Sequence, residues 1–142
     1  MSVTTRVLLD PTRMPSPTTW AREIRAQGFE ADLDTEFDQR TFSGFLPCVH
    51  RGVPAGFEYF FEPDADLDDD VRAAVGMQRT LEVAFVTHSD MRELVTALIA
   101  SAVLAYLADG IVWSDDSGEA YSPEDAIDLA RQTEADELPV TN

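Results

Sequence analysis

The amino-acid sequence predicts an α+β fold, in which an antiparallel or mixed sheet carries its helices mainly on one face; a ferredoxin-like arrangement is one example of this class. Three observations support the prediction. Strand-like apolar segments lie near both ends of the chain, hairpin-type strands lie in the middle, and a long apolar helix lies between the middle strands and the C-terminal strand.

The first third of the chain has the order strand, helix, strand. Residues 7–9 (VLL) form a short apolar run that is typical of a buried strand. Ser16 and Pro17 supply a helix N-cap and a proline at the first helical position, and Gly28 is a stop signal. Residues 29–34 then alternate between apolar and acidic side chains, which predicts a half-buried strand with one acidic face.

The middle of the chain is less regular. Residues 45–52 (FLPCVHRG) contain Pro47, which predicts an edge strand if the segment is a strand at all. The aromatic residues 57–61 (FEYFF) follow after a turn and complete a predicted hairpin. Residues 68–76 (DDDVRAAVG) can hold a helical turn with aspartates at its N-terminal end, and residues 80–87 (TLEVAFVT) are the clearest strand of the chain.

The C-terminal third begins with a long core helix. Asp90 and Glu93 form a capping-box pair at its start, and its broad apolar surface is predicted to lie against the sheet as far as about Asp109. Residues 111–113 (IVW) form a short strand. After a turn, Ser122 caps the last helix in the same way as Ser16 caps the first.

The length of 142 residues is that of one domain, so we expect a single domain over residues 1–142 with a frayed polar tail at 133–142. The single cysteine excludes an internal disulfide framework. The N-terminal apolar run is too short for a secretory signal, so a cytoplasmic protein is expected. Residues 97–108, the longest apolar stretch, have about half of the ~20 residues that a membrane span needs, and no membrane segment is predicted.

The charge balance is strongly acidic. The chain has 27 acidic and 10 basic residues, a net charge of −17, and no lysine. Such a field repels nucleic acid and anionic lipid and speeds the encounter with a basic partner. Nucleic-acid binding is therefore disfavoured. The charge has a second interpretation, which is that it keeps a small protein soluble.

A run of aspartates suggests a calcium loop but does not complete one. Asp64, Asp66 and Asp68 have the spacing of the first three ligands of an EF-hand. In the same register, Asp69 occupies the position of the required glycine and Val75 that of the bidentate glutamate. We therefore predict no metal and no cofactor.

Two histidines are candidates for chemistry. Cys48 and His50 alternate on one strand face, as a nucleophile and its base would, but no orienting carboxylate accompanies them. The favoured interpretation is a partly buried cysteine and a surface histidine. His88 precedes Asp90 in a turn whose residues are those that end a strand and cap a helix, so a capping role is favoured there. An enzyme is less expected than a binding protein.

The aromatic strand at residues 57–61 bears on binding. If Phe57, Tyr59 and Phe61 lie on one face, Phe60 must lie on the other. One aromatic side chain is then exposed beside a dense group of carboxylates, or both faces of the strand are covered; the sequence leaves these two alternatives open.

Three stretches resemble a group of small acidic bacterial proteins, some of which are similar to immunity proteins of secreted or contact-delivered toxins. They are DPTRMPSPTTWAREIRAQGFE, FSGFLPCVHRGVPAGFEYFFEP and LAYLADGIVWSDDSGEAYSPEDAIDLAR. The shared motifs are structural, namely helix caps, the aromatic strand and the turn before the last helix. The resemblance implies a toxin-neutralising function and no catalytic residue.

The resemblance and the charge together lead to one functional hypothesis, an immunity protein that binds a basic toxin through an acidic surface. The alternative is a small-molecule-binding protein or enzyme that uses a cleft between sheet and helices near His88 or His50. The residues predicted to bind the partner are aromatic or acidic: Tyr59, Phe60, Glu62, Asp64, Asp66, Asp68, Asp69, Asp70, Asp115 and Asp116.

Overall fold

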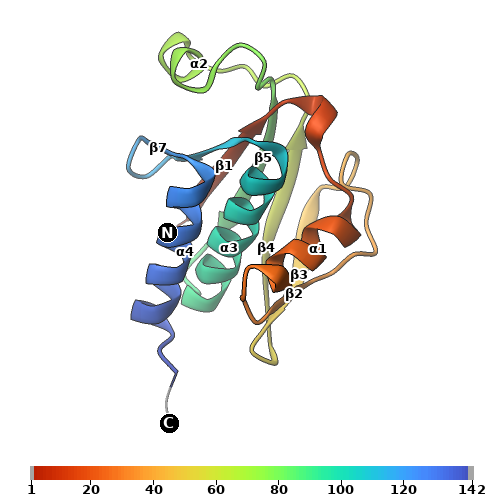
Figure 1. Cartoon of the computed structure of the whole chain (residues 1–142), viewed down its shortest axis with the longest axis vertical. Helices are drawn as coiled ribbons and strands as arrows, with labels where there is room; N and C mark the ends of the chain where they lie inside the picture. The colour runs from red at the N-terminus through yellow and green to blue at the C-terminus, as the bar shows by residue number, and fades with distance from the viewer. Residues whose placement is uncertain (1, 141–142) are drawn as a thin grey trace.

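The computed structural model describes residues 2–140, and in this range seven strands form one antiparallel sheet (Figure 1). The order across the sheet is β2-β3-β4-β5-β1-β6-β7. The strands are β1 (Val3–Leu9), β2 (Ala31–Leu33), β3 (Gly44–His50), β4 (Val53–Glu62), β5 (Leu81–Thr87), β6 (Ile111–Ser114) and β7 (Glu119–Tyr121). The predicted α+β class is confirmed.

The centre of the sheet has a ferredoxin-like topology. The strands β4, β5, β1 and β6 are neighbours in that order, and each is antiparallel to the next. One helix lies in the connection from β1 to β4, which are parallel and have β5 between them. Another helix connects β5 to β6, which are parallel and have β1 between them. This is the split β-α-β arrangement. The hairpin β2-β3 extends the sheet at one edge and β7 extends it at the other.

Three helices cover one face of the sheet, as expected. They are α1 (Pro17–Ala26), α3 (Met91–Ala108) and α4 (Pro123–Glu137), with α3 between the other two (Figure 1). A one-turn 3-10 helix, Pro11–Arg13, precedes α1, and the short helix α2 (Asp69–Val75) stands apart at one end of the sheet. Within residues 2–140, no layer of helices covers the other face of the sheet.

The helix α3 is the centre of the hydrophobic core. Asp90 caps it by accepting hydrogen bonds from the backbone N–H groups of Arg92 and Glu93, and it ends at Asp109 in the left-handed conformation. In length and hydropathy α3 would suffice for a membrane span, but 61% of it is buried within the fold, as in the core helix of a globular protein. Trp20 of α1 packs beside it and donates its indole N–H to the carbonyl oxygen of Ala100, at 3.0 Å.

The strand β3 is internal, and the prediction of an edge strand is wrong. Its neighbours are β2 and β4. Pro47 is tolerated because β2 pairs only with residues 48–50 and ends before it. The Pro47 carbonyl still accepts a hydrogen bond from the Asp34 N–H, at 3.1 Å, while the absent N–H of the proline lies where no strand needs it. Proline cannot donate a backbone hydrogen bond to a neighbouring strand, and at this position of the internal strand β3 no such bond is required.

The predicted fraying from residue 133 is also wrong for residues 133–137. The helix α4 continues to Glu137, and the half-buried Leu138 packs against the core. The charged residues of this segment are typical of a frayed tail. The Glu134 side chain, however, faces the protein and forms ion pairs there. Residues 139–140 have no regular structure, and the last two residues of the predicted tail lie outside the described range.

Candidate functional site

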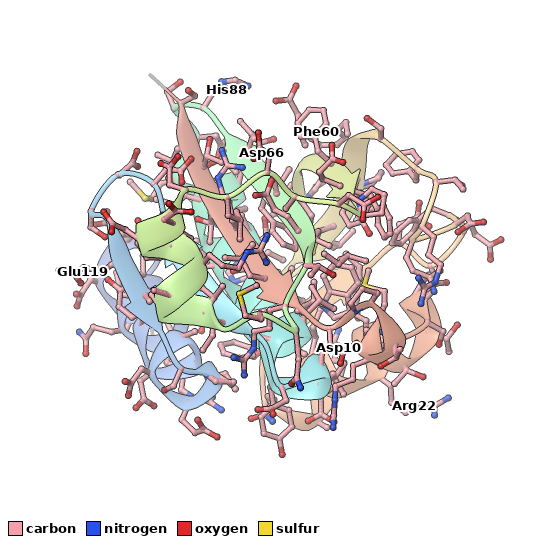
Figure 2. The ribbon with its side chains drawn as sticks, turned by 90° about the horizontal axis from the view of Figure 1, so that it is seen from above. Asp10, Arg22, Phe60, Asp66, His88 and Glu119 are labelled. Carbon is pink, nitrogen blue, oxygen red and sulfur yellow. The ribbon has the colours of Figure 1, made fainter. Side chains whose placement is uncertain are left out.

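The face of the sheet opposite α1, α3 and α4, here called the open face, carries the main surface features of the protein. The strand register sets its composition. One row across the sheet contains Phe60, Ala84, Arg6, Trp113 and Ala120, from β4, β5, β1, β6 and β7 in turn. The alternate residues of the same strands point to the helices and form the core. Figure 2 shows Phe60 and Asp66 on the side of the sheet opposite to Arg22 of α1.

The open face is apolar and exposed over β3 and β4. Phe45 is 50% exposed, Phe60 40% and Val49 38%. The Phe45 ring lies over Gly56, whose φ is +136°, and a Cβ at that glycine would come within 2.7 Å of the ring. Glycine there leaves room for the ring to approach the strand. The exposed aromatic that the sequence left as one of two alternatives is therefore present at Phe60, and Phe45 adds a second.

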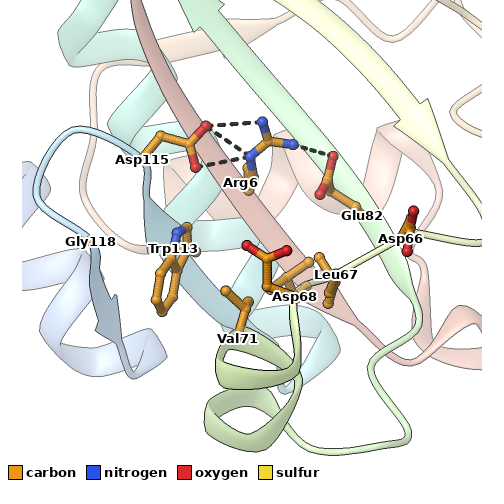
Figure 3. Close-up of a pocket in the computed structure, with 10 residues that line it drawn as sticks. Arg6, Asp66, Leu67, Asp68, Val71, Glu82, Trp113, Asp115 and Gly118 are labelled. Atoms are coloured by element: carbon orange, nitrogen blue, oxygen red, sulfur yellow. Dashed lines mark hydrogen bonds and ion pairs between the residues drawn. The ribbon is translucent and has the colours of Figure 1, made fainter.

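A cavity of about 350 Å³ adjoins this apolar area, between the sheet and the loop that carries α2 (Figure 3). Its floor is formed by β1, β5 and β6, and its outer wall by the segment 66–71. The lining residues are Arg6, Leu8, Asp66, Leu67, Asp68, Val71, Glu82, Trp113, Asp115 and Gly118. A second cavity of about 130 Å³, with a mainly polar lining, lies near Asp10 and Arg79.

Arg6 is held in the first cavity by two carboxylates. Its Nη1 lies 2.6 Å from Glu82 Oε2, and its Nε and Nη2 lie 3.0 and 2.9 Å from the two oxygens of Asp115. The hydrogen bond to Asp115 is the main cause that raises the pKa of Arg6. Burial raises the pKa of Glu82, and the neighbouring Arg6 only partly offsets this effect. One guanidinium is thus fixed by two acids.

Two further carboxylates at the cavity have no protein partner. Asp66 and Asp68 are exposed, and neither forms a hydrogen bond or ion pair through its side chain with any of residues 2–140. Asp68 occupies the N-cap position of α2, yet its side chain does not cap the helix. Asp68, Val71 and Trp113 line the same cavity (Figure 3). The cavity therefore has an excess of negative charge that the fold does not neutralise.

The predicted partner-binding residues fall into three groups. Asp66, Asp68 and Asp115, which are distant in sequence, line the same cavity, and Phe60 and Glu62 lie beside it on the open face. Four others are exposed but do not line the cavity: Asp64, Asp69, Asp70 and Asp116. The prediction that Tyr59 binds the partner is wrong.

Tyr59 is fully buried on the helix side of the sheet, so it cannot contact a partner. Its hydroxyl donates to the carbonyl oxygen of Gln39, and its ring packs against Trp20, Phe37, Phe42 and Phe85. Burial raises its pKa above the ordinary range of a tyrosine. The alternation along β4 that exposes Phe60 is the physical reason that Tyr59 is buried.

Sequence reasoning missed several residues of the site. Arg6 and Glu82 are the only charged residues of β1 and β5, and that pattern was the available signal for a polar site on a sheet face. Trp113 and Phe45 carried no such signal, since an aromatic residue in a strand is more often part of the core. Their exposure follows from the open face, which only the packing of the helices reveals.

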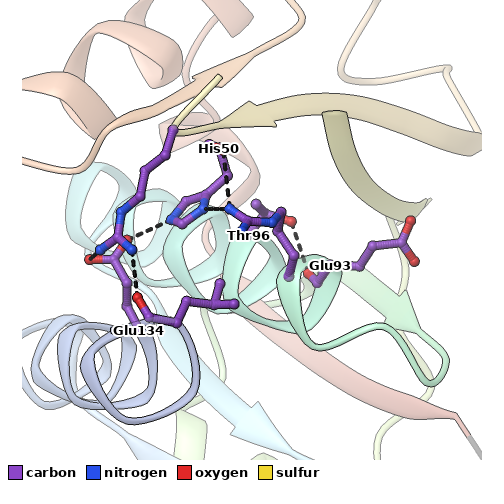
Figure 4. Close-up of polar contacts among 7 residues, drawn as sticks. His50, Glu93, Thr96 and Glu134 are labelled. Atoms are coloured by element: carbon purple, nitrogen blue, oxygen red, sulfur yellow. Dashed lines mark hydrogen bonds and ion pairs between the residues drawn. The ribbon is translucent and has the colours of Figure 1, made fainter. Parts of the chain in front are cut away.

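His50 belongs to a buried polar network, and the interpretation as a surface histidine is wrong (Figure 4). Arg92 Nη1 lies 2.7 Å from His50 Nδ1, and Glu134 Oε2 lies 2.7 Å from Nε2. Because a guanidinium only donates, Nδ1 accepts and Nε2 donates the ring proton to Glu134. Arg51 completes the network through Glu134 Oε1, at 3.5 Å, and the Leu138 carbonyl.

This network is structural rather than catalytic. Both His50 ring nitrogens are engaged, and the side chain has no exposed area. Cys48, two residues earlier, is also buried, and burial raises the pKa of its thiol to about 12, which removes the thiolate that a nucleophile needs. The network joins β3, α3 and α4, and it explains why α4 remains ordered beyond residue 133.

His88 is exposed, and its Nε2 lies 3.3 Å from Glu58 Oε2. It follows β5 directly, and Asp90 caps α3, which confirms the predicted turn and cap. Neither His88 nor His50 lines either of the two cavities described above. Neither of these two cavities therefore supports the alternative of a small-molecule site at a histidine.

The acidic residues were also compared with the grouping that a metal ion requires. Among residues 2–140, no three His, Cys, Asp or Glu side chains are grouped so that they could hold a metal ion. Asp64, Asp66 and Asp68 lie in the irregular segment between β4 and α2, and all three are exposed. Carboxylates without a protein partner can attract a cationic group.

No family model, curated protein or solved structure matches the chain. The resemblance to immunity proteins remains a prediction from the sequence stretches quoted above. The geometry of the open face is therefore the principal basis for a functional proposal.

The buried network leads to a stability prediction. The variant Glu134→Ala removes the acceptor of a buried His50 N–H and the partner of Arg51, and it should lower the free energy of unfolding by about 2 kcal/mol. Urea denaturation measures this. Glu137→Ala, an exposed residue of the same helix, is the control and should change stability by less than about 0.5 kcal/mol. Equal effects would contradict the anchoring role.

The raised pKa of Glu82 leads to a pH prediction. An unfolded glutamate has a pKa of about 4.3, and the folded value is higher, so between the two the folded state binds more protons. The contribution of Glu82 to stability should thus decrease as the pH rises from about 4.3 through its folded pKa. The stability difference between wild type and Glu82→Gln, measured by urea denaturation across this range, should fall with rising pH. A difference that grows with pH would contradict the burial of this carboxylate.

Proposed function

We propose that the protein is a binding module that docks a basic protein partner on its open face. The observation that carries the proposal is an uncovered sheet face with exposed aromatic side chains and a border of carboxylates. A sheet in a globular domain ordinarily buries its apolar face against another layer. Here the helices cover one face only, and the exposed Phe45 and Phe60 on the other are of the kind that anchors protein interfaces.

The charges beside the aromatic residues indicate what partner would fit. Glu58 lies in the cross-strand pair with Phe45, and Glu62 pairs across the sheet with Glu82. Asp66 and Asp68 extend this acidic border along the cavity. With a net charge of −17 the whole molecule attracts a cationic partner over long range, and the border carboxylates select it at contact.

The more particular form of the proposal is an immunity protein that neutralises a cognate bacterial toxin. The sequence resemblance and the acidic surface support it together. A toxin that acts on nucleic acid or on anionic lipid presents a basic active surface, and an acidic face that covers this surface would block it. In that role the protein would act in the cytoplasm of the cell that it protects.

The proposal predicts which side chains a partner requires. The immobilised protein is incubated with extract of its native cells, and captured proteins are identified by mass spectrometry. The double variant Phe45→Ser/Phe60→Ser should capture the specific partner in an amount about tenfold lower than wild type, or lower still, because both aromatic anchors of the open face are lost. Tyr106→Ser, which removes an aromatic of similar exposure on α3, should retain it fully.

The captured partner must also meet two conditions. Its capture should weaken as salt rises from about 50 to about 500 mM, since screening reduces the attraction between opposite charges. Its expression alone should arrest growth, and co-expression of the wild-type chain but not of the double variant should restore it. Capture that is lost equally with Tyr106→Ser, or that is indifferent to salt, would overturn the proposal.

A further inference from the structure

The cavity between the sheet and α2 has the features of a receptor for one side chain. Its volume of about 350 Å³ lies at the lower end of the range for small-ligand pockets. Leu8, Leu67 and Val71 supply the apolar wall, and Trp113 supplies a partly buried aromatic ring. An elongated group with an apolar stem and a polar end fits such a lining better than a compact ion does.

The charges of the cavity specify the sign of that polar end. Four carboxylates, those of Asp66, Asp68, Glu82 and Asp115, line the cavity together with a single guanidinium, that of Arg6. Glu82 is only 8% exposed, and its Oε1 accepts no hydrogen bond from residues 2–140. This oxygen is not fully buried, so a donor from outside the fold can reach it. The excess of carboxylates over guanidinium in the cavity therefore favours a cation.

The resident Arg6 shows which cation these carboxylates accommodate. Its guanidinium binds both oxygens of Asp115 and one oxygen of Glu82 within 3.0 Å. A second guanidinium could approach from the solvent side, where Asp66 and Asp68 have no partner and the Trp113 ring is available for stacking (Figure 3). Planar guanidinium groups stack on aromatic rings and bind carboxylates in pairs, which an ammonium group does less well.

We infer, on the basis of the proposed function, that the cavity receives an arginine side chain of the basic partner. The Trp113 ring lies against the guanidinium, and the carboxylates of Asp66 and Asp68 accept its hydrogen bonds. The open face provides the apolar contact area, and the adjoining cavity provides recognition of one residue. Both lie on the same side of the sheet, because Phe60 and Trp113 belong to one cross-strand row. One partner surface can therefore reach both.

The test uses short peptides and needs no partner. The ¹⁵N-labelled protein has two indole N–H signals, and the peptide acetyl-Gly-Arg-Gly-amide should shift that of Trp113. The signal of the buried Trp20, bonded to the Ala100 carbonyl, should stay unchanged. The citrulline peptide has the same shape without the charge and should cause no shift, and the lysine peptide should bind more weakly than the arginine peptide.

Matched charge variants separate the cavity from the general acidic field. Asp66→Asn/Asp68→Asn removes two carboxylates that line the cavity, and it should abolish the shift. Asp69→Asn/Asp70→Asn removes two neighbouring carboxylates that do not line it, and it should retain the shift. All four residues are exposed, so neither variant disturbs the core. Equal loss in both variants, or an equal shift with citrulline, would overturn the inference.

The same variants distinguish this inference from the proposed function. If Asp66→Asn/Asp68→Asn and Asp69→Asn/Asp70→Asn capture the partner equally while Phe45→Ser/Phe60→Ser does not, the open face binds a partner and the arginine pocket is refuted. If the peptide response is specific but no salt-sensitive partner is captured, the proposed function fails. The cavity would then serve a free organic cation, and the assignment to a partner side chain would be refuted.

Discussion

The burial of α3 against one face of the sheet determines where the other helices lie and which face of the sheet stays open. This helix is apolar around most of its surface, so it needs the sheet below it and a helix on each side. α1 and α4 take those two positions, and the buried network around His50 ties α4 in place. All three long helices are thereby committed to one face. The other face is left to the strands and to the loop that carries α2.

Because the three long helices lie on one face of the sheet, the open face is a free surface, and it has two parts. Over β3 and β4 it is apolar, with Phe45 and Phe60 exposed, and over β1, β5 and β6 it holds a cavity with four carboxylates. Arg6 stands at the boundary and neutralises part of that charge from within the sheet. A hydrophobic area beside a charged pocket is the arrangement by which a surface combines affinity with selection of its partner.

Much of the fold was predictable because its signals are local. Ser16, Asp90 and Ser122 each cap the helix that the sequence predicted, and strand alternation correctly placed Phe60 opposite to Phe57. The errors concern relations between distant segments. The position of β3 inside the sheet depends on the short strand β2, and the order of residues 133–137 depends on His50. Neither segment contains a signal that identifies these partners. The cavity could not be predicted for the same reason, because its lining comes from segments far apart in the sequence.

In the proposed complex the open face, rather than the helical face, contacts the partner. Hydroxyl-radical footprinting of the complex with the captured partner distinguishes the two faces, because exposed aromatic side chains on both faces report in one experiment. Binding should protect Phe45, Phe60 and Trp113 from oxidation and leave Tyr106 on α3 as reactive as in the free protein. Protection of Tyr106 with unchanged oxidation of Phe45 and Phe60 would contradict the account.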